Sequence, residues 1–261
     1  MAVDPEQVDG RQAPRQFAKL TYDRFRQLAR DESLSESEKI GYPNAFRDGY
    51  ERAILADFCS KLPALLRRGA TILDLGCGCG ELARRLIGHC RQLDQRLVLV
   101  DSAEMLALLP DSGDAIKLSG RFPDETAGAL SALSDGGFDA IICYGVLHVA
   151  FQDANPFRLL DEAVALLAPG GGLLLGDIAN QSKLRRFLAS AAGEAFHKAY
   201  MRTDTPPELP LFAPAGDRID DAVMLGLIQR ARSAGYDAYV LPQPAELPLS
   251  NRREDLLVTR P

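Results

Sequence analysis

The sequence lacks an excess of basic residues and a cysteine framework. Its 261 residues contain 30 Lys and Arg against 36 Asp and Glu, which gives a formal net charge of −6. Proteins that bind duplex nucleic acid normally show a basic stripe, so this balance argues against nucleic acid as a partner. The 5 cysteines are odd in number and scattered, which argues against the disulfide framework of a small secreted protein.

Signals that would direct the chain to a membrane are also missing. The first residues, MAVDPEQVDG, have no cationic start followed by an apolar stretch, so they do not have the pattern of a signal peptide. The longest mostly apolar stretch, AIICYGVLHVAF, is too short to span a bilayer. We therefore expect a soluble, cytoplasmic protein with no membrane partner.

The chain is predicted to divide near residue 60. Residues 1–60 are expected to form a disordered tip and a helical leader, because apolar residues recur at helical spacing in 14–30 and again from Asn44, a plausible N-cap. The charged stretch DESLSESEK between them is expected to be a linker. The main domain is predicted over residues 61–261.

From Ala70 onward, short apolar runs alternate with helical stretches. Near-continuous apolar strands between helices predict an α/β fold: a doubly wound, Rossmann-like, mostly parallel sheet with helices on both faces. Five such runs are followed by two more strands near the end of the chain, so we expect seven strands with an antiparallel final strand. The runs are TILDLG, RLVLVD, AIKLSG, FDAIICYG and GGLLLGDI, and the final pair is YDAYVLPQP and EDLLVTR.

An insertion follows the fifth strand, over about residues 181–218, and is expected to form a helical lid. The spacing of apolar residues predicts one amphipathic helix from about Lys183 to Met201, followed by the proline-rich TDTPPELPLFAPAG. A further helix is predicted from about Asp220 to Ala234.

The turn after the first strand, TILDLGCGCGEL, allows several interpretations. A dinucleotide loop of the G-x-G-x-x-G type needs glycine at position 81, where this chain has Glu81. A zinc site is disfavoured, because Cys77 and Cys79 stand too close for the usual clamp and His89 and Cys90 follow only at the far end of a helix. The glycines allow the backbone to approach a ligand closely.

Two acidic residues narrow the choice of ligand. Asp74, inside the end of the first strand, favours a ligand with an amino group. Asp101 ends the second strand, 21 residues after Gly80 (101 − 80), and a carboxylate there can accept both hydroxyls of a ribose. An adenosine with a cationic amino-acid tail fits both residues.

Four segments in order resemble class I S-adenosylmethionine-dependent methyltransferases: LDLGCGCG, LVLVDSAEML, FDAIICYGVLHV and LLAPGGGLLLGD. The final strand pair resembles the antiparallel hairpin of that family, and the resemblance covers about residues 60–261. It implies S-adenosylmethionine as cofactor and a small-molecule acceptor. The family often has an acidic residue after the third strand, near the adenine amino group, whereas LSGRFPDE offers Arg121 and Phe122 there, so adenine contact is expected from Phe122 stacking and a backbone carbonyl. The residues expected to bind the cofactor are Asp74, Gly76, Cys77, Gly78, Gly80, Asp101, Ser102, Met105, Arg121, Phe122, Tyr144, Gly145 and Leu147.

The residues that contact the acceptor are predicted at the same edge of the sheet, where the strands end. His148 follows the fourth strand and is the candidate base for a hydroxyl acceptor, with a packing role as the alternative. Arg185 and Arg186 in the insertion, and Arg252 and Arg253 in the last loop, suggest an anionic acceptor such as a nucleotide-linked sugar, unless they form a solvated surface. A non-catalytic cofactor-binding protein and an NAD(P)-dependent oxidoreductase remain as alternatives, and a homodimer is possible.

Overall fold

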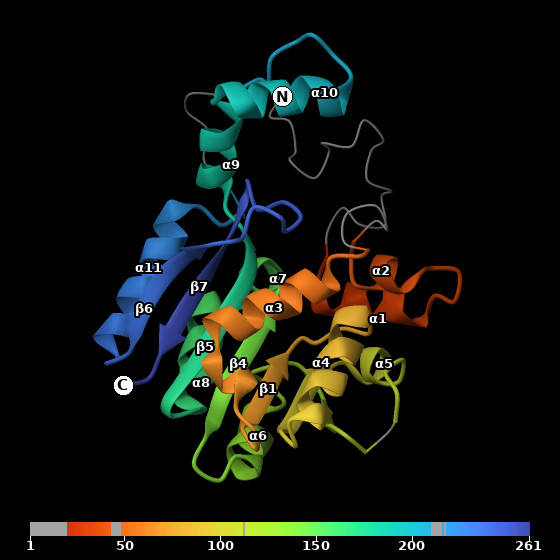
Figure 1. Ribbon diagram of the computed structural model, residues 1–261, viewed down its shortest axis with the longest axis vertical. Helices are drawn as coiled ribbons and strands as arrows, with labels where there is room; N and C mark the ends of the chain where they lie inside the picture. Colours follow the sequence, from red (N-terminus) through yellow and green to blue (C-terminus); the bar gives the residue numbers. More distant parts are fainter. Residues whose placement is uncertain (1–19, 43–47, 112, 210–215, 217) are drawn as a thin grey trace.

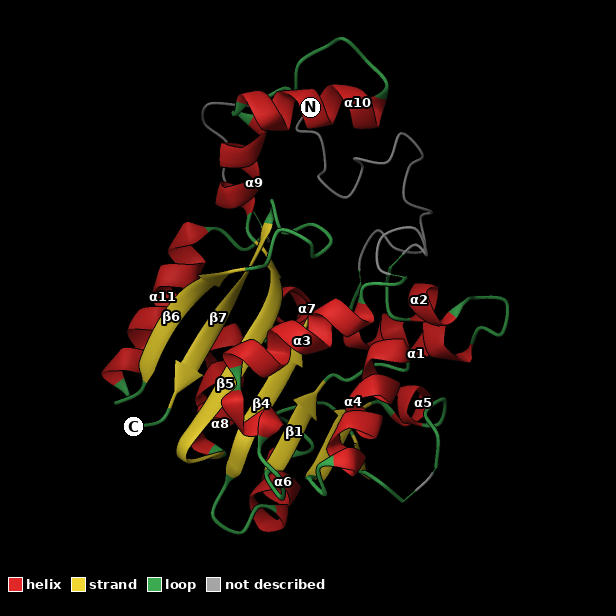
Figure 2. Cartoon of the chain, in the orientation of Figure 1, coloured by secondary structure: helices red, strands yellow, loops and turns green. Residues whose placement is uncertain are grey.

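The described part of the chain folds around one seven-stranded sheet (Figure 1; Figure 2). The computed structural model describes residues 20–42, 48–111, 113–209, 216 and 218–261. The strand order is β3-β2-β1-β4-β5-β7-β6, with β1 to β5 parallel and β7 antiparallel to both of its neighbours. The predicted sheet is confirmed. The strands are β1 (Thr71–Leu75), β2 (Arg96–Asp101), β3 (Ile116–Ser119), β4 (Phe138–Tyr144), β5 (Leu167–Ala179), β6 (Asp237–Pro242) and β7 (Arg253–Thr259).

Helices cover both faces of the sheet, because successive side chains of a strand point to opposite faces. Leu73 and Leu75 of β1 pack in one apolar cluster with α6 (Ala127–Leu133), α8 (Pro156–Ala165) and α11 (Asp221–Ser233). Ile72 packs in a second cluster with α3 (Glu51–Lys61) and α4 (Glu81–Gln92). This double burial explains why the central strands are apolar at nearly every position.

The leader begins, in the described residues, with α1 (Tyr22–Arg30) and α2 (Glu36–Lys39). The prediction of a linker was wrong over α2. Ser35 caps this short helix by accepting from the Glu38 N–H at 3.3 Å, and the Glu38 carboxylate accepts from the Ser35 N–H at 2.9 Å. Asn44 lies outside the described residues, and α3 begins at Glu51.

The single helix predicted from Lys183 to Met201 was also wrong. Two helices, α9 (Gln181–Leu188) and α10 (Ala191–Met201), meet at an angle and extend beyond the edge of the sheet (Figure 1). Helix α9 ends at Leu188 with Ala189 as its C-cap, and Ser190 is the N-cap of α10, because its hydroxyl accepts from the Gly193 N–H at 3.1 Å. Gly193 allows the close approach, since a Cβ there would lie 1.8 Å from the Phe187 carbonyl oxygen.

The remaining helices are short: the 3₁₀ helix η4 (Pro63–Leu66) precedes β1, α5 (Ala103–Leu106) follows β2 and α7 (Leu147–Asp153) follows β4. None of the helices among the described residues is long and apolar enough to cross a membrane. The helix predicted from about Asp220 is confirmed as α11, whose first turn is capped by the Asp220 carboxylate accepting from the Val223 N–H at 3.1 Å.

Candidate functional site

A cavity lies at the carboxyl ends of β1, β2 and β4. The strand order reverses at β1, since the chain continues to β2 on one side and later to β4 on the other. Ligands of open α/β sheets bind at this switch point. Of the residues predicted to bind a cofactor, the cavity lining includes Asp74, Gly76, Cys77, Gly78, Gly80, Asp101, Met105, Arg121, Phe122, Tyr144 and Gly145. Their role in binding a cofactor remains a prediction.

The glycine loop runs along the floor of the cavity. Gly76 has φ +75°, and a Cβ there would lie 2.5 Å from Cγ2 of Val146. Gly78 has φ +64°, which side chains rarely adopt. Gly80 is the N-cap of α4 without a side-chain hydrogen bond, so the first amides of α4 remain available to a polar ligand.

Asp101 stands at the tip of β2, where two backbone amides hold its carboxylate. Oδ2 accepts from the Gly78 N–H at 2.8 Å, and Oδ1 accepts from the Ser102 N–H at 2.6 Å. Burial nevertheless raises the pKa of Asp101 to about 6. Each carboxylate oxygen keeps a further lone pair for a ligand hydroxyl. Ser102 is not in the cavity lining, and its hydroxyl instead caps α5 by accepting from the Met105 N–H at 3.3 Å.

The two cysteines of the loop pack against other side chains and are not arranged as ligands for a metal ion. Cys79 is fully buried beside Ala29 and Met105. Burial raises the pKa of Cys79 to about 11 and that of Cys77 well above its usual value, so both thiols keep their protons at neutral pH. Within the described residues, no group of three or more His, Cys, Asp and Glu side chains could hold a metal ion.

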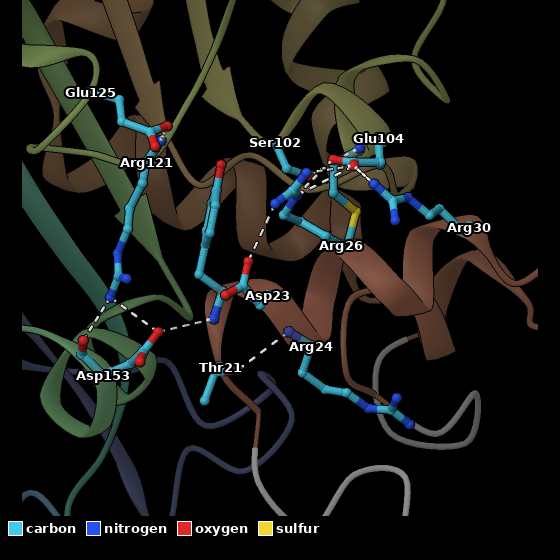
Figure 3. A network of polar contacts seen from close by, with 12 residues as sticks. Thr21, Asp23, Arg24, Arg26, Arg30, Ser102, Glu104, Arg121, Glu125 and Asp153 are labelled. Atoms are coloured by element: carbon cyan, nitrogen blue, oxygen red, sulfur yellow. Dashed lines mark hydrogen bonds and ion pairs between the residues drawn. The ribbon is translucent and has the colours of Figure 1, made fainter.

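The leader forms one wall of the cavity through Tyr22, Phe25, Ile40 and Tyr42. Helix α1 is fixed to α5 by an ion-pair cluster, in which Arg26 and Arg30 both reach Glu104 (Figure 3). Arg26 Nη2 lies 3.0 Å from Glu104 Oε1 and Nε lies 3.1 Å from Oε2. The hydrogen bond from Arg26 lowers the pKa of Glu104 to about 2.

The start of α1 is fixed on the other side of the cavity, to Asp153 at the end of α7. The Tyr22 N–H donates to Asp153 Oδ2 at 3.3 Å, and Arg121 donates to the Asp153 carbonyl oxygen at 2.7 Å (Figure 3). The Arg121 guanidinium also lies 5.7 Å from the centre of the Tyr22 ring. Burial and the nearby Asp101 raise the pKa of Tyr22 to about 12. Tyr22 is therefore a neutral side chain beside the carboxylate at the tip of β2.

The end of β4 supplies the opposite side of the cavity. Tyr144 lines it and packs edge-on against Phe58, with ring centroids 4.9 Å apart. Leu147 is not in the lining; its side chain is buried in the apolar core at the start of α7. The neighbouring Val146 and Val149 reach the cavity in its place.

His148 also stands outside the cavity lining. Its Nδ1 is buried without a hydrogen-bond partner among the described residues. Burial and the charge of Arg253 lower the pKa of His148 to about 4, so the ring is neutral at pH 7.

Asp177, which the sequence did not single out, faces the end of β4. Its Oδ2 accepts from the Tyr42 hydroxyl at 2.7 Å, and the residue has φ +57°. The pairing of β5 with β7 shifts register between Leu175 and Ile178, so Asp177 lies in a bulge. Such bulges redirect side chains near functional sites.

None of the four arginines predicted to bind the acceptor is in the cavity lining. Arg186 forms an ion pair with Asp221, and Arg253 Nη1 donates to the Asp177 carbonyl oxygen at 3.0 Å. Arg185 lies on α9. The Arg252 guanidinium lies 5.4 Å from the centre of the Phe196 ring.

The seven-stranded sheet with its antiparallel β7 has the architecture of the class I S-adenosylmethionine-dependent methyltransferase fold, and the cavity lies at the switch point of this sheet. Residues 72–171 match a family model described as a methyltransferase domain. Residues 72–171 are therefore recognised as a methyltransferase domain.

Individual relatives agree with this class. The chain is 26% identical over 159 residues to the ubiquinone biosynthesis O-methyltransferase of Paraburkholderia phytofirmans, across 57% of this chain and 64% of that one. It is 31% identical over 120 residues to a probable tRNA methyltransferase 9B of Mus musculus, across 46% of this chain and 24% of that one. The chain thus spans less than two thirds of the length of either relative.

Solved structures share the fold at low sequence identity. The plantazolicin methyltransferase BamL, in complex with a triazolic desmethylPZN analog and SAH, superposes with a TM-score of 0.57 at 15% identity, covering 94% of this chain and 97% of that one. An SAM-dependent methyltransferase from Aquifex aeolicus superposes with a TM-score of 0.51 at 15% identity, covering 92% of this chain and 99% of that one.

Proposed function

We propose that the protein transfers a methyl group from S-adenosylmethionine to a small molecule. The observation that carries this proposal is the pair of carboxylates, Asp74 and Asp101, at neighbouring strand tips on either side of the glycine loop. The methyltransferase family match and the SAH named in the BamL structure support the same cofactor.

The residues present fit an adenosyl compound with an amino-acid tail. Asp101 would accept the ribose hydroxyls, and Met105, Phe122 and Tyr22 would surround the adenine. Asp74 and the loop amides would hold the amino-acid end. When bound, the cofactor supplies an activated methyl group, so the protein's part is to align the acceptor and exclude water. The leader, fixed over the cavity at both rims, supports the exclusion of water.

We propose an oxygen as the methylated atom and His148 as the base. The O-methyltransferase relative supports oxygen as the acceptor atom. The His148 ring is neutral at pH 7 and its Nδ1 has no partner among the described residues, so a ring nitrogen can accept a proton. With a pKa of about 4 it would be a weak base, suited to an acceptor whose hydroxyl is already acidic.

We propose further that the acceptor is anionic and that Arg252 contacts it. Burial and the charge of Arg253 lower the pKa of Arg252, and no carboxylate of the described residues counters this effect. A half-buried guanidinium without a carboxylate is stabilised by an anion. Arg186 is the matched control, because Asp221 already neutralises it. Arg252→Glu should raise the acceptor KM about tenfold or more, whereas Arg186→Glu should change it less than threefold.

The test of the cofactor is calorimetry with S-adenosylhomocysteine and, separately, NAD(P)+. Binding of S-adenosylhomocysteine that is lost in Asp101→Ala supports the proposal, and binding of NAD(P)+ instead contradicts it. An acceptor screen starting from anionic sugars follows, with methyl transfer measured directly. Cofactor binding without turnover of any acceptor would favour the alternative of a non-catalytic cofactor-binding protein.

A further inference from the structure

We propose that Tyr42 and Asp177 form a hydrogen-bonded pair at the methyl end of the cofactor cavity, where they hold the attacking atom of the acceptor. This inference rests on the proposed function and assigns the acceptor position within it. The Tyr42 hydroxyl, 2.7 Å from Asp177 Oδ2, donates its proton to that carboxylate. A phenol oxygen can accept as well as donate, so the Tyr42 hydroxyl can accept a hydrogen bond from the hydroxyl or amine of an acceptor while it donates to Asp177.

The position of the pair follows from the strand order. Asp101 lies at the tip of β2 on one side of β1, and Gly145 and Asp177 lie at the ends of β4 and β5 on the other side. An adenosyl compound with its ribose on Asp101 would extend across β1 toward β4. This direction brings its sulfur atom, with the methyl group, toward Gly145 and Tyr42, which both line the cavity.

Gly145 leaves the space that the pair occupies. A Cβ on Gly145 would lie 3.3 Å from the Tyr42 hydroxyl oxygen and 3.9 Å from Asp177 Oδ2. Gly145 also has φ +72°, a conformation that other residues rarely adopt. The turn after β4 thus lies against the Tyr42 hydroxyl in the cavity wall, and the Asp177 carboxylate lies directly behind that hydroxyl.

Asp177 is held in place through its backbone. Asp177 is only 5% exposed and keeps a left-handed backbone in the β5 bulge. Its N–H donates to Asp255 Oδ1 at 2.9 Å, and Arg253 donates to its carbonyl oxygen at 3.0 Å. Backbone strain that is held in place by neighbours is typical of functional sites. Asp177 is therefore a positioning residue, and Tyr42, which comes from the leader, is the residue that meets the acceptor.

Two cofactor analogues test this position without knowledge of the acceptor. S-adenosylhomocysteine has no group in place of the methyl, whereas sinefungin carries an ammonium on carbon at that point. An ammonium beside the Tyr42 oxygen and the Asp177 charge gains a charge-assisted hydrogen bond. We expect calorimetry at pH 7 to show that sinefungin binds about tenfold more tightly than S-adenosylhomocysteine.

The variants separate the pair from general effects on binding. Tyr42→Phe removes only the hydroxyl and should reduce the tenfold preference to less than threefold, and Asp177→Asn should do the same. Tyr50→Phe is the matched control, because this tyrosine of the same leader is 39% exposed and outside the cavity lining; it should keep the full preference. Equal binding of the two analogues by the unaltered protein, or a preference that survives in Tyr42→Phe, would overturn the inference. Failure to bind S-adenosylhomocysteine at all would instead overturn the proposed function on which it rests.

Discussion

Asp101 gives the proposed cofactor site a pH dependence whose size follows from the structure. Burial raises the pKa of this carboxyl to about 6 in the ligand-free protein. Only the ionised carboxylate accepts hydrogen bonds from both ribose hydroxyls while it keeps those from Gly78 and Ser102. Affinity for S-adenosylhomocysteine should therefore be constant above pH 7 and fall as the pH drops through about 6.

The expected change at pH 5 is about tenfold in Kd, or about 1.4 kcal/mol, because that pH lies one unit below the pKa. Three other groups near the site titrate outside this window: the pKa of Glu104 is about 2, that of His148 about 4 and that of Tyr22 about 12. The step measured between pH 5 and 8 should consequently belong to Asp101.

Calorimetric titration from pH 5 to 8 is the assay, with Asp101→Asn as the test variant. The amide cannot accept from all four donors, and losing two hydrogen bonds to a charged group should weaken binding by about 3 kcal/mol, roughly 100-fold, and remove the pH step. Asp111→Asn, a substitution of a side chain that is 97% exposed, should leave the affinity for S-adenosylhomocysteine and its pH step unchanged. A Kd independent of pH in the unaltered protein, or a step that persists in Asp101→Asn, would refute this reasoning.

Three further predictions concern the framework around the site. Gly76→Ala should lower the free energy of unfolding by about 2 kcal/mol or more, because the new Cβ would lie 2.5 Å from Val146 at φ +75°. Urea unfolding measures this, and Gly88→Ala, in α4 with open space around it, should raise stability by roughly 0.5–1 kcal/mol. Lys61→Met should cost about 3–5 kcal/mol in the same assay, because it leaves the buried carboxylates of Asp57 and Asp255 without the ammonium that lies 2.6 Å from each; a loss below about 1 kcal/mol would contradict this. Glu104→Gln should speed amide hydrogen exchange in α1, with a loss of about 1 kcal/mol that is present above pH 4.5 and disappears as the pH falls toward 2, since the pKa of Glu104 is lowered from 4.5 to about 2. Unchanged exchange in residues 22–30 would count against it.

The sheet could be predicted from the sequence because burial on both faces leaves a strong pattern. The runs around Leu73 and Leu99 are apolar at nearly every position and are separated by helical stretches. The glycine loop was predictable for a similar reason, since Gly76 and Gly78 have backbone conformations that other residues rarely adopt. Both features are local in the chain.

The helix boundaries that were wrong had local signals too. Ser35 and Glu38 form the Ser-x-x-Glu pattern of a capping box, which the charge of the surrounding stretch hid. Ser190 is a helix-capping residue inside a run whose apolar spacing continues across it, so periodicity alone joined α9 and α10.

Asp177 could not have been found in this way. Its direction depends on a bulge between β5 and β7, strands that are far apart in the sequence, and on Tyr42, which is 135 residues away. Similarly, nothing local indicates that Asp221 would neutralise Arg186. These are tertiary contacts between residues far apart in the chain, and a single sequence does not show which of its residues meet.

The segment from Tyr22 to Tyr42 lines the cavity although the recognised methyltransferase domain begins at residue 72. Under the proposed function, a stretch that lies outside the seven strands would therefore control access to the methyl end of the cofactor. Exchange of these few residues between related proteins would retune substrate choice while the cofactor-binding floor stayed the same.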